Sequence, residues 1–122
     1  MKAEAVFPFL TEESKMYRSK TVEYYHVSKK ALTILDVYDK NQEKSLVLGI
    51  IFHDVKKLNQ KLKTQLLYDE FGIDQDDPMF ECLYSIRNEK NTQTFLLSLG
   101  DNVAIIKAES VELVTEGVYA VG

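Results

Sequence analysis

Cysteine and glycine are scarce in this chain, and long apolar runs are missing. Cys82 is the single cysteine among 122 residues, so no internal disulfide can form, which fits a reducing compartment. The five glycines are scattered, which excludes a phosphate-binding loop or a dinucleotide-binding fingerprint. No apolar run reaches the roughly 18–20 residues that a membrane helix needs, and the first residues, Met1–Pro8, hold no signal-peptide core. These absences predict a cytoplasmic protein.

Residues that carry catalysis or bind metals are equally few. The two histidines, His26 and His53, have no sequence partner that implies activation. Cys82 lies on the apolar side of an alternating stretch, which predicts a buried, unreactive thiol. The acidic stretch Asp74–Pro78 lacks the turn glycine and the distal glutamate of a calcium-binding loop, and its proline interrupts it. We therefore expect no enzyme activity, no catalytic residue, no bound metal and no cofactor.

Length, composition and charge predict one globular domain. Hydrophobic residues make up 45% and charged residues 28% of the chain, and the formal net charge is −4, which does not exclude a local basic surface. We expect a single domain over residues 1–122. Within it we expect an N-terminal arm or short helix over 1–19, a core over 20–100 and C-terminal strands over 101–122.

One strong helix is predicted from Asp54 to Gly72. Val55, Leu58, Leu62, Leu66 and Phe71 recur at steps of three to five residues and would share one helix face. Asp54 would cap the start, and Gly72 would end the helix in a left-handed conformation. A second, short helix is expected over Thr11–Lys20, with Thr11 as its cap.

The remaining apolar segments have the pattern of strands. Three precede the long helix, namely Thr21–Val27, Ala31–Tyr38 and Leu46–Phe52, and two follow it, namely Phe80–Arg87 and Phe95–Leu99. Shorter strands are expected at Val103–Ile106, Val111–Val114 and Val118–Val121, and Gly49 inside a strand predicts a bulge or sharp bend. The apolar residues of 103–121 need cover, so this segment should pair with the sheet edge or with a second subunit.

This order of elements predicts a mainly β fold: an OB-fold-like antiparallel barrel with one helix between strands 3 and 4. Over residues 20–100 the chain resembles small OB-fold single-stranded DNA-binding proteins, of the kind encoded by phages of low-GC Gram-positive bacteria. The alternative is an α+β sheet of the PAS or longin type. The run Thr21–Val27 discriminates, because a strand inside a barrel favours the OB-fold, whereas an edge strand counts against it.

Lysines in the expected turns and tyrosines on the expected strands suggest how such a protein would bind. Cations neutralise phosphates, and aromatic rings stack on bases without reading sequence. The candidate nucleic-acid-binding residues are Tyr25, Lys29, Lys30, Tyr38, Lys40, Lys44, Arg87 and Lys90, whereas Tyr24 and Tyr84 are expected in the core.

The resemblance implies non-catalytic binding of single-stranded DNA, with little sequence preference, in replication or recombination. The need to cover the apolar residues of 103–121 predicts a homo-oligomer, and a phage-encoded protein would work in the host cytoplasm. Many bacterial relatives end in an acidic tail with a terminal aromatic residue, and the final stretch Val118–Gly122 departs from that pattern. The alternative function is that of a protein-binding module, or a phage-encoded inhibitor of a host protein. It would use an acidic surface made of Asp69, Glu70, Asp74, Asp76, Asp77 and Glu81.

Overall fold

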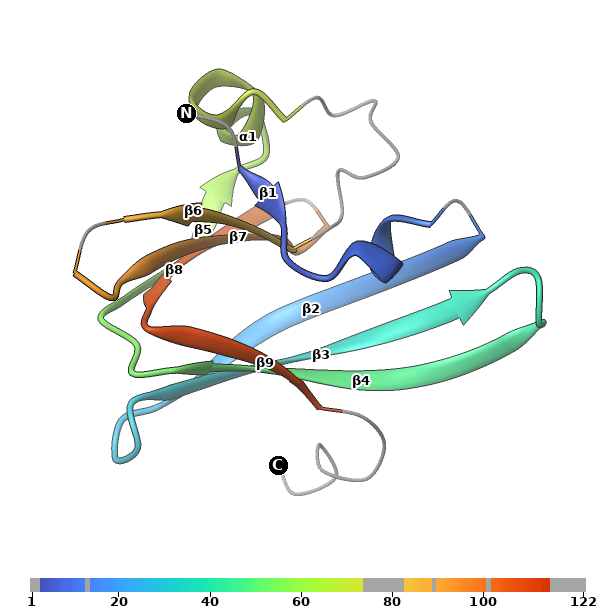
Figure 1. Cartoon of the computed structure of the whole chain (residues 1–122), viewed down its shortest axis with the longest axis horizontal. Coiled ribbons are helices and arrows are strands. Elements are labelled where there is room, and N and C mark those ends of the chain that lie inside the picture. Colours follow the sequence, from blue (N-terminus) through green and yellow to red (C-terminus); the bar gives the residue numbers. More distant parts are fainter. Residues whose placement is uncertain (1–2, 13, 74–82, 89, 101, 115–122) are drawn as a thin grey trace.

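Two antiparallel sheets that face each other make up the protein (Figure 1). The computed structural model describes residues 3–12, 14–73, 83–88, 90–100 and 102–114. The four-stranded sheet has the order β2-β3-β4-β9, with bounds β2 Lys15–Tyr25, β3 Lys30–Asp39, β4 Lys44–His53 and β9 Ser110–Val114. The second sheet has the order β1-β6-β7-β8-β5.

The five-stranded sheet is assembled from both halves of the chain. Its strands are β1 Glu4–Ala5, β6 Leu83–Arg87, β7 Gln93–Ser98, β8 Asn102–Ala108 and β5 Lys57–Lys63. A 3₁₀ turn spans Pro8–Thr11, and the helix α1 spans Gln65–Phe71. The helix lies on the side of this sheet that faces away from the four-stranded sheet (Figure 1).

The two sheets are joined at a corner where two chain segments change sheet together. The N–H of Glu109 donates to the carbonyl of His53 at 3.0 Å, and the N–H of Lys56 donates to the carbonyl of Lys107 at 2.6 Å. Asp54, between β4 and β5, takes a left-handed φ of 53°. The crossing from β4 to β5 is thus bonded to the crossing from β8 to β9, and residues 49–63 and 102–114 bend as one antiparallel pair.

The core fills the space between the sheets. Phe52 of β4 and Phe95 of β7 are fully buried, and their rings meet edge to face with centroids 5.5 Å apart. Aromatic pairs in this geometry contribute about 0.5–1.5 kcal/mol beyond the area that they bury. β7 is buried on both faces, since Thr94, Leu96 and Ser98 of its opposite face are also buried.

One side-chain amide connects the edge strands of the two sheets. Gln60 of β5 accepts a hydrogen bond from the Val22 N–H and donates one to the Val22 carbonyl, each at 2.9 Å. Both residues lie at register shifts, between Ser19 and Val22 in β2 and between Asn59 and Leu62 in β5. Because β2 is an edge strand, Val22 has no described neighbouring strand on its open side. The amide of Gln60 takes the place of that neighbour.

Hydroxyl groups supply further hydrogen bonds to the β2 bulge. Thr33 donates to the carbonyl of Thr21 at 3.0 Å, and the buried hydroxyls of Ser19 and Thr33 are 2.7 Å apart. Because the single proton of Thr33 is used on Thr21, Ser19 must donate to Thr33. The bulge is thus stabilised by side chains of β3 and β5.

The predicted mainly β, antiparallel fold with one helix is confirmed, but the described strands form no closed barrel. β2, which contains the first predicted strand, lies at the edge of its sheet, and this counts against the barrel. The strand predictions for Ala31–Tyr38, Leu46–Phe52, Phe95–Leu99, Val103–Ile106 and Val111–Val114 are confirmed within a few residues. The predictions for residues 80–82 and 118–121 lie outside the described residues.

The long helix over 54–72 was predicted wrongly. Residues 57–63 form β5, and only Gln65–Phe71 is helical. Lysines and leucines alternate there as exposed and partly buried side chains, and pairing with β8 outweighs the weak helical period. Gly72 does end the helix with a φ of 70°, donating to the Tyr68 carbonyl. Asp54 lies at the corner and caps nothing.

Two further predictions are corrected. The expected helix over Thr11–Lys20 is mostly strand, because β2 begins at Lys15, with Tyr17 and Ser19 buried at a spacing of two. Gly49 has no bulge and pairs regularly with Ile34 and Val114. The bulges lie in β2 and β5 instead.

The C-terminal strands are covered by the same chain. β8 lies between β7 and β5, and β9 pairs with β4. Of the two predicted ways to cover this segment, pairing with a sheet edge is confirmed for residues 102–114. Those residues therefore supply no argument for a second subunit.

Removing the Gln60 amide should destabilise the protein. We expect Gln60→Ala to lower the free energy of unfolding by about 1–3 kcal/mol, since both polar backbone groups of Val22 lose their partner. Urea denaturation measures this, with Lys61→Ala, an exposed neighbour in the same bulge, as the control. Equal stability of the two variants would show that water replaces the amide at no cost.

Candidate functional site

The four-stranded sheet has one buried and one exposed face. Along β3, Ala31, Thr33, Leu35 and Val37 are buried, while the residues between them are more exposed. The inner face meets β7 through Phe52. We call the opposite surface, formed by the side chains of β2, β3, β4 and β9 that point away from the five-stranded sheet, the outer face. It carries most of the predicted site.

Three predicted residues lie together at one end of the outer face. Tyr25 pairs across the strands with Lys30, and Lys29 is in the turn between them with a left-handed φ of 53°. The side chain of Tyr25 is 38% exposed. The carbonyl of Lys29 accepts the N–H of Val55 at 2.8 Å, so this turn is attached to the corner.

Three others lie at the opposite end of the sheet, where Tyr38 points to the outer face and Lys44 shares its side of β4 with the buried Leu48 and Ile50. Tyr38, at the end of β3, is 40% exposed. Lys40 and Lys44 flank the turn that follows, where the carboxylate of Asp39 accepts the N–H of Asn41 at 2.9 Å. The turns β2–β3 and β3–β4 are at opposite ends of the sheet (Figure 1). At about 3.3 Å per residue, the eight steps along the chain from Lys30 to Tyr38 span about 26 Å.

The centre of the outer face was missed in the sequence. Leu32, Ile34, Val47 and Ile51 project from the two middle strands. On the edge strand, Met16 is 55% exposed and pairs with Tyr38. The alternation within β3 contained this signal, because Leu32 and Ile34 lie on the opposite side of the strand from the buried residues. The face is therefore apolar in the middle and has lysines at both ends.

The outer face also carries charges of both signs. Arg18 pairs across the strands with Asp36, and Glu112 is 2.5 Å from Nε2 of His53 through its carboxylate. The hydroxyl of Tyr25 donates to the carboxylate of Glu23 at 3.0 Å. This hydrogen bond, together with burial and the negative charge of Glu23, raises the pKa of Tyr25. The basic ends therefore lie beside acidic groups.

Tyr24 and Tyr84 are packed, as predicted. Tyr84 is buried, whereas Tyr24 is partly buried against the core with its ring 4.7 Å from that of His26. The two tyrosines that were predicted to stack on bases are thus the exposed ones among these four.

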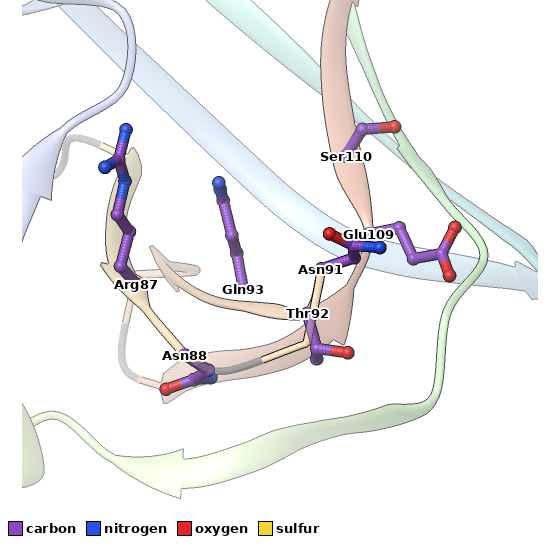
Figure 2. Close-up of a pocket in the computed structure, with 7 residues that line it drawn as sticks. All are labelled: Arg87, Asn88, Asn91, Thr92, Gln93, Glu109 and Ser110. Carbon is purple, nitrogen blue, oxygen red and sulfur yellow. The ribbon is translucent and has the colours of Figure 1, made fainter.

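Arg87 and Lys90 do not join the other predicted residues. They belong to the β6–β7 hairpin of the five-stranded sheet, so the eight candidate residues are divided between the two sheets. Arg87 lines an open polar cavity of about 550 Å³, which we call the hollow (Figure 2). Its lining residues are Arg87, Asn88, Asn91, Thr92, Gln93, Glu109 and Ser110.

The hollow lies where the β6–β7 hairpin meets the junction of β8 and β9. Arg87 and Gln93 are cross-strand partners, and their side chains point the same way, side by side (Figure 2). Lys90 and Asn91 have left-handed φ values of 60° and 62°, which tightens the turn. The side-chain amide of Asn88 donates to the hydroxyl of Thr94 and closes the hairpin.

None of the six predicted basic residues forms an ion pair with a described carboxylate. Within the described part of the chain, no group of three or more histidines, cysteines, aspartates or glutamates could hold a metal ion. None of the described helices is long and apolar enough to cross a membrane. Of the expected acidic surface, Asp69 and Glu70 are exposed on α1, and the other four residues lie outside the described residues, as does Cys82.

No protein-family model, no curated protein and no solved structure matches this chain.

The raised pKa of Tyr25 gives a direct test of the outer face in solution. We expect Glu23→Gln to lower the pKa of Tyr25 towards its ordinary value, because the acceptor of the hydroxyl proton and its negative charge are both weakened. NMR titration with ¹³C-labelled tyrosine measures this, and Tyr25→Phe assigns the signal. An unchanged pKa would mean that the two side chains do not meet in solution.

Proposed function

We propose that this protein binds single-stranded DNA across the outer face, without catalysis. The observation that carries the proposal is that Tyr25 and Tyr38 are both exposed on one face of a sheet, and that each is followed by a turn with two lysines that form no ion pair with a described carboxylate. Exposed aromatic rings bordered by cations are the features that proteins use to hold single strands.

The strand would run along β3, from the β2–β3 turn to the β3–β4 turn. Bases would stack on Tyr25 and Tyr38 and lie over the apolar centre at Leu32 and Ile34. The lysines of the two turns would neutralise phosphates. The path of about 26 Å suits the short end of the roughly 4–16 nucleotides bound per module of this kind. Stacking does not read sequence, so little sequence preference is expected.

By the resemblance drawn from the sequence, the role of such binding would be in phage DNA replication or recombination. The outer face carries acidic as well as basic groups, because Glu23, Asp36 and Glu112 lie on it. We therefore expect modest affinity with a shallow dependence on salt, since few counterions are released.

Removing the stacking rings should weaken binding strongly. We expect Tyr25→Ala and Tyr38→Ala each to cost about 1–3 kcal/mol, or about 5- to 150-fold in Kd. Fluorescence anisotropy with labelled oligo-dT measures this at several salt concentrations, with duplex DNA in parallel. Tyr68→Ala is the matched control, since Tyr68 is 54% exposed on α1, outside the outer face.

Three outcomes would count against this assignment. Failure to bind oligo-dT at low salt would rule out the proposed function. Equal affinity for duplex DNA would leave a basic surface without stacking. Oligo-dT binding that is unchanged in the double variant of Tyr25 and Tyr38 would move the site elsewhere.

The apolar centre of the outer face supports a second candidate, binding of a protein. Met16 and Ile34 are 55% and 38% exposed, and charges of both signs surround them, which is typical of protein interfaces more than of nucleic-acid sites. A second copy of this chain is the simplest partner and would account for the expected homo-oligomer.

A charge in the centre of the outer face should separate these candidates. If the face binds a second copy, the wild-type mass in light scattering should rise with concentration in the tens of micromolar range. Ile34→Glu should then abolish the rise, because a buried unpaired carboxylate is costly. A constant monomer mass in the wild type would exclude self-association through this face.

A further inference from the structure

The hollow brings many hydrogen-bond donors together around one cation. Arg87 supplies a guanidinium with five N–H donors, and Gln93 beside it supplies an amide. Asn91, Thr92 and Ser110 add a second amide and two hydroxyls from the opposite wall. These groups come from three separate chain segments, so the hollow depends on the tertiary fold.

The guanidinium of Arg87 forms no ion pair within the described part of the chain, because no described carboxylate is within ion-pair distance of it. Glu109 is the one acidic residue of the lining. Its carboxylate is 3.9 Å from Nζ of Lys56, and its side chain extends away from Arg87 (Figure 2). The carboxylate of Glu109 is therefore directed to Lys56, which leaves the guanidinium of Arg87 available to an anion.

We propose that the hollow binds a phosphate monoester, with Arg87 as the residue that recognises the phosphate. A guanidinium fork fits two phosphate oxygens, and the neutral amides and hydroxyls can bond the remaining oxygens and a polar substituent. A volume of about 550 Å³ is within the 300–1,000 Å³ range typical of small-ligand sites, and exceeds what an inorganic anion alone would fill.

Two sources could supply this chemistry: a free nucleotide, or the 5′-phosphate at the end of a nucleic-acid strand. Both present a doubly charged phosphate group on a sugar. The site is separate from the outer face, so this proposal does not depend on the proposed DNA binding.

Titrations followed by ¹H–¹⁵N NMR test the proposal with adenosine 5′-monophosphate, adenosine, and short oligo-dT with and without a 5′-phosphate. We expect a phosphorylated probe to shift the side-chain amide signals of Asn91 and Gln93 and the backbone signal of Ser110. Shifts with adenosine 5′-monophosphate would show that a free nucleotide is enough for binding. Shifts only with the phosphorylated oligonucleotide assign a strand end.

The variant Arg87→Gln should weaken that binding at least about tenfold, because a charge-assisted pair is lost. Lys63→Gln removes one positive charge from an exposed position of β5, at the end of the sheet away from the hollow and outside the outer face, and should leave the affinity unchanged. The proposal is overturned if neither phosphorylated probe shifts these signals. It is also overturned if adenosine shifts them as strongly, or if Arg87→Gln and Lys63→Gln behave alike.

Discussion

The amide of Gln60 is the interaction on which the relation between the two sheets depends. It joins the bulge of β5 to the bulge of β2 through both polar backbone groups of Val22. At the corner, backbone hydrogen bonds already hold the sheets together. The amide adds a connection between edge strands that do not form a backbone ladder with each other. An otherwise unpaired stretch of β2 is thereby fixed, with Ser19 and Thr33 completing its hydrogen bonds.

That connection helps to hold one face of the four-stranded sheet against the core and leaves the other face exposed to solvent. Val22 and Tyr24 are held against the core, and the next residue along, Tyr25, must then point outwards. The same alternation in β3 buries Val37 and exposes Tyr38. Both candidate stacking rings are therefore placed by the packing of their neighbours.

Local sequence pattern was enough to find most strands and the exposure of Tyr25 and Tyr38. It failed where tertiary pairing decides the conformation. The period of Leu58 and Leu62 is compatible with a helix, and only the presence of β8 makes residues 57–63 a strand. The hollow could not be predicted, because Arg87 and Ser110 are far apart in sequence and meet only through the corner. The candidate binding residues were separated for a related reason, since Arg87 and Lys90 belong to a different sheet from the other six.

The corner also has a consequence for the order in which the protein can fold. Among the described strands, β5 pairs with β8 alone, and β8 follows it by about forty residues. During synthesis, β5 therefore leaves the ribosome well before its partner exists, and the five-stranded sheet cannot close until residues 102–108 emerge. Contacts this distant slow folding and leave edges exposed. The lysines at positions 57, 61 and 63 would discourage β5 from pairing with other chains during this delay, as charges on edge strands do.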